Sequence, residues 1–253
     1  MIRKQGFVAL LDILGFSERV AQDAELGGID RYISTVIDET QAYPDLRVIL
    51  FSDTVLIYTL DDSPHAGQSI IEASSRLEHS LLAKEVPLRG AIAHGTFARS
   101  ENDLNGTVVA GRPIIEAHYY EAQLQWVGII LAPSVLRQMP ELPTRGIVHG
   151  PRGNEEIDNY IARTAQEARV QPCDRIPVEL SPGTSTSYLE GFAVVPLGGN
   201  AQTPQDLKQC MSENLARLRW LKQLAPDPRS QAKYGNTIAW LQPLYQQWIM
   251  RLH

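Results

Sequence analysis

An aspartate inside an apolar run is the feature that most constrains how this chain folds. Asp12 stands within FVALLDILGF, residues 7–16, where nearly every other residue is apolar. A short apolar run bounded by Gly6 and Gly15 predicts a buried strand. Burying an unpaired carboxylate is costly in free energy, so Asp12 needs a neutralising partner in the folded protein.

The order of the next elements predicts an α+β fold. From residue 6 to residue 95 we expect strand, helix, strand, strand, helix, strand. The first strand lies at residues 6–14. A helix capped by Ser17 follows, and after the Gly27-Gly28 break a second helical stretch lies at 29–40. The remaining elements lie at 46–60 (two strands joined as a hairpin by Ser52-Asp53), 64–84 and 87–95. This order is that of a ferredoxin-like βαββαβ sheet with helices packed on one face.

The rest of the chain is less regular. We expect a polar loop at 98–106, and 140–187 is too rich in Pro, Gly and charge to assign. The further predicted elements are a helix at 111–124, strands at 126–132 and 188–197, a short helix from Pro133, and amphipathic helices at 204–224 and 228–252.

Composition excludes several classes of function. The 253 residues are 43% hydrophobic and carry a net charge of −6, so the chain is an ordinary globular protein without a basic surface for nucleic acid. Cys173 and Cys210 lack the spacing of a zinc site, and they do not suggest a disulfide framework. The first apolar run is too short for a signal peptide or a membrane span, so we expect a cytoplasmic protein without stable membrane association.

A second aspartate, Asp53, lies in the turn of the predicted hairpin. In a ferredoxin-like sheet the first strand lies beside a hairpin strand, so Asp12 and Asp53 would meet at one end of the sheet. Close carboxylates repel unless a cation neutralises them, and such hard oxygen ligands suit Mg²⁺ or Mn²⁺ held together with substrate phosphates. The alternative for Asp53 is a turn-forming residue without a ligand.

The residues after Asp12 suggest a phosphate site. Gly15 permits a tight bend, and Phe16 and Ser17 begin a helix. Backbone N–H groups at the start of a helix bind anions, so a metal pair beside them would suit a triphosphate.

Four segments, in the same order, resemble class III nucleotidyl cyclase domains. FVALLDILGFSERV resembles their opening motif, and ILFSDTVLIY resembles their second metal-binding hairpin, with Ser52 where a glycine is usual. PLRGAIAHGTF resembles the next strand, and GTVVAGRPIIEAHYYEAQ resembles the helix that contacts the dimer partner. The resemblance covers roughly residues 5–135.

The resemblance implies a site, a reaction and an assembly. Two divalent cations, Mn²⁺ or Mg²⁺, would be bound by Asp12, Asp53 and the backbone carbonyl of Ile13. The ribose 3′-oxygen of a nucleoside triphosphate would attack the α-phosphorus, and pyrophosphate would leave. The active sites would be shared across a homodimer. Residues 1–200 would form the catalytic domain, and residues 201–253 a helical extension packed on the core or on the partner.

The sequence departs from the family where the base and the transition state are bound. The positions of the family's transition-state Asn and Arg are Ile115 and Tyr119, and the positions of its adenine-reading Lys and Asp are Ile49 and Val108. Neither Ile49 nor Val108 can hydrogen-bond through its side chain. The domain is therefore either inactive or specific for another base.

The same segments are similar to the pyrimidine cyclases of bacterial Pycsar anti-phage systems, which make cyclic UMP or cyclic CMP to activate a separate effector protein. We prefer UTP as the substrate because Ile49 and Val108 are apolar, and CTP stays open. The alternatives are a regulatory module that binds nucleotides without turnover and a polymerase-like palm domain. The palm domain is disfavoured because no basic template-binding surface is evident.

Several side chains are candidates for the remaining roles. Arg112 is the candidate replacement for the transition-state arginine, with a structural or solvated arginine as the alternative for both Arg112 and Arg89. Glu116 and Glu121 are expected to cap or pair on the helix surface, and Lys233 is a further candidate for phosphate contact. The residues expected to contact substrate are Gly15, Phe16, Ser17, Ile49, Phe51, Arg89 and Tyr119.

Overall fold

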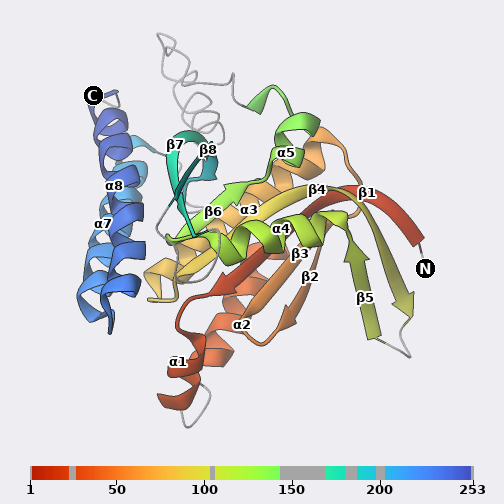
Figure 1. Cartoon of the computed structure of the whole chain (residues 1–253), viewed down its shortest axis with the longest axis horizontal. Helices are drawn as coiled ribbons and strands as arrows, with labels where there is room; N and C mark the ends of the chain where they lie inside the picture. Colours follow the sequence, from red (N-terminus) through yellow and green to blue (C-terminus); the bar gives the residue numbers. More distant parts are fainter. Residues whose placement is uncertain are drawn as a thin grey trace.

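The computed structural model describes residues 2–22, 27–102, 106–142, 169–179, 187–197 and 203–251. In these residues a mixed sheet is flanked by helices on both faces (Figure 1). Its strands are β1 (Ile2–Ile13), β2 (Leu46–Phe51), β3 (Thr54–Thr59), β4 (Leu88–Asn102), β5 (Gly106–Gly111), β6 (Gly128–Leu131), β7 (Val170–Val178) and β8 (Ser187–Val194). The helices are α1 (Phe16–Gln22), α2 (Gly27–Thr40), α3 (Pro64–Ala83), α4 (Arg112–Gln123), α5 (Pro133–Gln138), α7 (Pro204–Leu224) and α8 (Pro228–Arg251).

The strand order confirms the predicted α+β, ferredoxin-like core. The sheet runs β2-β3-β1-β4-β6-β8-β7, and β5 pairs with β4 outside this path. β1 therefore lies between β3 and β4 and pairs antiparallel with both. Any side chain near the end of β1 is thus held between two neighbouring strands.

The two faces of β1 have different partners. Phe7, Leu11 and Ile13 are buried in the main core with residues of α2 and α3. Leu10 packs on the cluster that contains Ala117 of α4, on the opposite face. Because side chains alternate along a strand, Asp12 lies on the same face as Leu10, toward α4.

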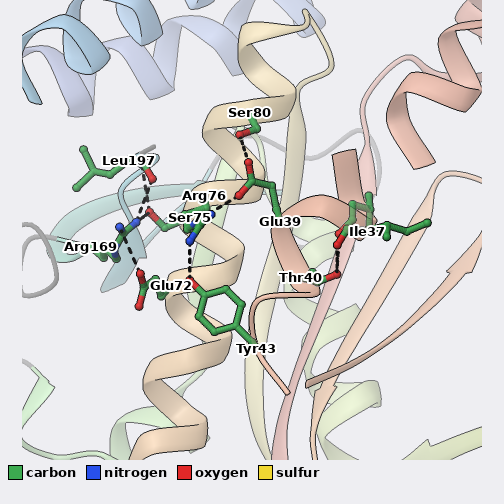
Figure 2. Close-up of polar contacts among 11 residues, drawn as sticks. Ile37, Glu39, Thr40, Tyr43, Glu72, Ser75, Arg76, Ser80, Arg169 and Leu197 are labelled. Carbon is green, nitrogen blue, oxygen red and sulfur yellow. Dashed lines mark hydrogen bonds and ion pairs between the residues drawn. The ribbon is translucent and has the colours of Figure 1, made fainter. Parts of the chain in front are cut away.

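Polar side chains tie α3 to its neighbours on both sides (Figure 2). Glu39 of α2 accepts from Arg76 Nε at 3.0 Å and from Ser80 Oγ at 2.6 Å. Arg169, just before β7, donates to Ser75 Oγ at 2.8 Å and to the Leu197 carbonyl at 3.0 Å. These buried and half-buried contacts connect α3 to α2 on one side and to the segments that flank β7 and β8 on the other.

Two parts of the sequence-based prediction are wrong or incomplete. The predicted polar loop at 98–106 is largely strand, because β4 continues to Asn102 and pairs with β5. β7 lies within residues 140–187, for which the sequence predicts no element. Residues 143–168 and 180–186 of that stretch lie outside the described part.

The extra C-terminal helices are present and pack on the chain's own core. Leu207 and Leu218 of α7 and Leu241 of α8 share a buried cluster with Leu82 of α3 and Val127. α7 begins with a capping box between Thr203 and Asp206, which satisfies its first backbone N–H groups. Within the described ranges, no helix has the length and hydrophobicity that crossing a bilayer requires.

Candidate active site

A row of residues across the sheet forms the floor of the candidate site. In register, Phe51, Thr54, Asp12, Arg89 and Gly128 stand side by side on β2, β3, β1, β4 and β6. Paired residues of neighbouring strands point to the same face, so Asp12 and Arg89 share the face that α4 covers.

The hairpin turn brings Asp53 to the same end of the sheet. The backbone N–H of Ile13 donates to the Asp53 carbonyl at 3.0 Å, so the turn lies directly against the end of β1. The structure therefore places both aspartates at one end of neighbouring strands.

Backbone conformation at this end is specialised in two places. Gly15 has a φ of 73°, the left-handed conformation that glycine adopts without steric cost, and it turns the chain from β1 into α1. Ser52, the first residue of the two-residue turn Ser52-Asp53, has a φ of 56°. A non-glycine residue in this conformation stores strain, and such strain concentrates at functional sites.

Arg89 is the immediate counter-ion of Asp12. Arg89 Nε donates to Asp12 Oδ2 at 3.1 Å, and Arg89 Nη2 forms an ion pair with Glu121 Oε1 at 2.8 Å. His118 Nδ1 lies 3.4 Å from the other Glu121 oxygen. Glu121 is 5% exposed, so its expected position on the helix surface is wrong. Ala117 and Leu124, one turn away on each side, are also buried and show why: all three lie on the inward face of the helix.

The electrostatics of Asp12 reflect this crowding. Burial raises the pKa of Asp12 to about 6, the charges of Glu121 and Asp53 add to the rise, and Arg89 opposes it. The carboxylate is therefore mostly ionised at neutral pH, although its ionised form is less stable than that of an exposed aspartate. Such a perturbed acid at the end of a sheet is typical of functional sites.

The donor set fits a hard divalent cation bound together with a ligand. Among the described residues, His, Cys, Asp and Glu side chains form no group of three or more that could hold a metal on its own. Asp12 and Asp53 offer two carboxylates at this end of the sheet. Mg²⁺ typically binds proteins through one or two carboxylates plus substrate phosphates, so a bound substrate would have to complete the coordination.

Tyr32 of α2 is a neighbour of this site that the sequence did not suggest. Its hydroxyl is buried and has no hydrogen-bond partner among the described residues. Burial and the charges of Asp53 and Asp12 raise the pKa of Tyr32. Together with Ile13 and Phe16, Tyr32 lines a cavity of about 680 Å³ on the α2 side of β1. A buried tyrosine beside the strand that carries the aspartate has no signature in local sequence.

The other expected substrate contacts lie on the sheet, on α4 and on α1. Phe51 and Ile49 lie on the face of the sheet that carries Asp12. Phe51 is in register with Asp12, and Ile49 is in register with Leu10. Tyr119 and Ile115 are 56% and 72% exposed on α4. Ser17 is exposed at the start of α1, and the side chain of Val108 lies outside the described part.

Arg112 is not brought to Asp12 within one chain. The next residue, Pro113, lies against Gly95, which pairs with Gly6. Gly6 and Asp12 are separated by six residues of extended strand, or roughly 20 Å. A role for Arg112 at the aspartates thus requires a second copy of the chain.

Asp12→Asn is expected to stabilise the protein at neutral pH. The carboxyl pKa is about 6 in the folded protein against an ordinary 3.8, so the folded state holds more protons between these values and stability falls as pH rises through this window. The amide removes this cost, which is about 3 kcal/mol. Thermal unfolding at pH 7.5 should show a higher melting temperature for the variant, and the difference should vanish near pH 4. An equal or lower melting temperature at pH 7.5 would contradict the raised pKa.

Similar solved structures are catalytic domains of nucleotide cyclases. The guanylate cyclase domain of RhGC from Catenaria anguillulae, in complex with GTP, has a TM-score of 0.53 at 12% identity, over 78% of this chain and 99% of that one. The catalytic core of a rhodopsin-guanylyl cyclase with converted specificity, in complex with ATPαS, has a TM-score of 0.53 at 11% identity, over 78% and 98%. A guanylyl cyclase domain of the RhoGC fusion protein from Blastocladiella emersonii has a TM-score of 0.51 at 10% identity, over 77% and 97%.

At these identities the likeness is one of fold. No protein-family model and no curated protein matches the sequence. The chain thus has the fold of nucleotide cyclase catalytic domains, and its chemistry must be argued from its own residues.

Proposed function

We propose that the protein is a metal-dependent nucleotidyl cyclase. The observation that carries this proposal is the convergence of Asp12 and Asp53 at one end of a cyclase-type sheet, beside the Gly15 turn. In this proposal Asp12, Asp53 and the Ile13 carbonyl hold two divalent cations, Mg²⁺ or Mn²⁺. Bound there, the cations would lower the pKa of the attacking ribose hydroxyl and stabilise the leaving pyrophosphate.

The chain's own groups would position the substrate. Backbone N–H groups of Gly15, Phe16 and Ser17 would bind the phosphates, since unpaired N–H groups at the start of a helix favour anions. Asp12 and Asp53 would fix the triphosphate so that the 3′-oxygen, the α-phosphorus and the leaving oxygen are in line. The products would be a cyclic nucleoside monophosphate and pyrophosphate.

We further propose that the base is a pyrimidine. Ile49 and Val108 stand where the purine-reading Lys and Asp of adenylate cyclases would be, and neither side chain can hydrogen-bond. We propose UTP as the substrate and cyclic UMP as a second messenger for an effector protein in anti-phage defence, with CTP as the alternative. The resemblance to pyrimidine cyclases supports this specificity, and Phe51 and Tyr119 are the aromatic side chains proposed to contact the nucleotide.

Product identification tests the proposal. The purified protein would be incubated with Mn²⁺ and each of the four nucleoside triphosphates, and the products separated by chromatography. Cyclic UMP from UTP is the expected result. Cyclic AMP or cyclic GMP would refute the base assignment and keep the reaction. Nucleotide binding without any cyclic product would favour a regulatory module. The replacement of the family's Asn and Arg by Ile115 and Tyr119 supports that alternative.

We also propose a homodimer with shared sites. Phe51, Ile115 and Tyr119 are 79%, 72% and 56% exposed, on β2 and α4. Ile115→Arg is therefore expected to convert the dimer to a monomer, as measured by sedimentation velocity, and to reduce turnover. Ile37→Arg, at a 51% exposed isoleucine on α2, is the matched control and should stay dimeric. A wild-type protein that sediments as a monomer at micromolar concentration would contradict the proposal.

A further inference from the structure

α8 docks on the segment that joins α4 to β6. Thr237 Oγ1 donates to the Val127 carbonyl at 2.7 Å and accepts from the Val127 N–H at 2.9 Å. Asn236 Nδ2 donates to the Gln125 carbonyl at 2.7 Å. Thr237 is 2% exposed, so these bonds are protected from water. They fix both the rotation and the height of α8 against the core.

This docking segment is adjacent to Arg89. Gly128, the residue after Val127, is the partner of Arg89 in the pairing of β6 with β4. The Leu124 carbonyl, on the other side of the segment, accepts from Arg89 Nη1 at 3.5 Å. The side of α8 that carries Thr237 therefore faces the end of the sheet where Arg89 binds Asp12.

Lys233 lies one helical turn before Thr237 on this side of α8. Residues four apart share a helix face, and Thr237 Oγ1 also lies 3.1 Å from the Lys233 carbonyl. The long, flexible stem of a lysine lets its ammonium reach beyond the helix that carries it. Lys233 therefore lies on the side of α8 that faces the candidate site.

The Lys233 ammonium interacts electrostatically with the charges of the candidate site. Burial lowers the pKa of Lys233, the charges of Arg89 and Arg229 lower it further, and Asp12 and Asp227 oppose the fall. Arg89 is already engaged by Asp12 and Glu121. The Lys233 ammonium, by contrast, donates no hydrogen bond within the described ranges, so it is available to a ligand.

We propose that Lys233 is the cation of the same chain that contacts the triphosphate of the bound nucleotide. This inference rests on the proposed function and assigns it a further residue. The family's transition-state arginine position is Tyr119, which carries no charge, and Arg112 follows the part of the sheet near Gly6, roughly 20 Å along β1 from Asp12. A lysine binds phosphate as a point charge, and charge that accumulates on the phosphates during the reaction would strengthen its contact.

Lys233→Met should lower kcat/KM for the cyclised nucleotide by about 10²-fold, the loss typical when one such electrostatic contact is removed. Lys233→Arg should restore part of it, because the positive charge is kept. Lys222→Met is the matched control: Lys222 is exposed on α7, with its Nζ close to Gly235 of α8, and should behave as wild type. Thermal unfolding of all variants checks that α8 stays docked.

A binding measurement separates this inference from the proposed function. Calorimetric titration with Mn²⁺ and inorganic tripolyphosphate should show binding about tenfold weaker in Lys233→Met than in wild type and Lys222→Met. If the wild type makes no cyclic product but this difference holds, the proposed reaction fails and the phosphate contact stands. If Lys233→Met matches the wild type in turnover and in tripolyphosphate binding, or if Lys222→Met loses as much, the inference is overturned.

Discussion

Asp53→Asn is expected to abolish cyclic nucleotide formation while the fold is retained. The amide keeps the shape of the side chain in its two-residue turn but removes the negative charge that a divalent cation requires. Metal ions contribute several kcal/mol to transition states of this kind, and about 4 kcal/mol corresponds to a loss of about 10³-fold. Product formation from UTP and CTP, followed by chromatography, measures the loss.

The control for this variant is Asp38→Asn, which changes an exposed aspartate on α2, away from the site. It should keep wild-type turnover. If Asp53→Asn retains more than about a tenth of the wild-type rate, the activation free energy has risen by less than about 1.4 kcal/mol. Asp53 would then hold no essential cation.

Arg89→Met should destabilise the protein strongly. The substitution leaves Asp12 without its nearest cation and leaves Glu121, which is 5% exposed, without its guanidinium partner. Removing one member of a buried ion pair costs about 3 kcal/mol or more, because the remaining charge stays desolvated. For a chain of this size the melting temperature should fall by roughly 10 °C, measured by circular dichroism.

The double variant Arg89→Met/Glu121→Met distinguishes an uncompensated charge from lost packing. It removes Glu121, the more deeply buried of the two carboxylates that Arg89→Met leaves without a guanidinium, so it should recover much of the lost stability. A single variant that melts within about 2 °C of wild type would show that water or another group compensates Glu121.

The central fold follows from sequence pattern because its strands are buried and apolar. β1 to β4 carry the alternation and the turn residues that specify a ferredoxin-like sheet. β4 beyond residue 97 departs from the expected loop because it pairs with β5 and, as far as Arg99, also with the first residues of β1. Ser100, Glu101 and Asn102 lie beyond the pairing with β1, and three polar residues in a row suggest a loop in the sequence.

β7 was missed for a different reason. Pro172 and Pro177 argue against a strand, because proline cannot donate to the ladder of hydrogen bonds. β7 is, however, the last strand of the sheet after β8, and an edge strand tolerates proline. Strand order is a tertiary property that local sequence does not contain.

The candidate site was predictable in part. Asp12 stands out because a carboxylate in an apolar strand demands an explanation, and Asp53 follows from the hairpin. The pairing of Arg89 with Asp12 depends on the register between β1 and β4, and the burial of Glu121 depends on which face of α4 meets the sheet. Both arise only when distant segments pack.

The docking of α8 also determines when the site is complete during synthesis. Asp12 and Lys233 are separated by more than two hundred residues, and the bonds from Thr237 to Val127 form only after α8 has been made. Contacts between such distant segments form late, because the chain between them must first be ordered. Under the proposed function, a ribosome-bound chain that already carries both aspartates would still lack the phosphate contact of Lys233, and its turnover would stay low until α8 docks.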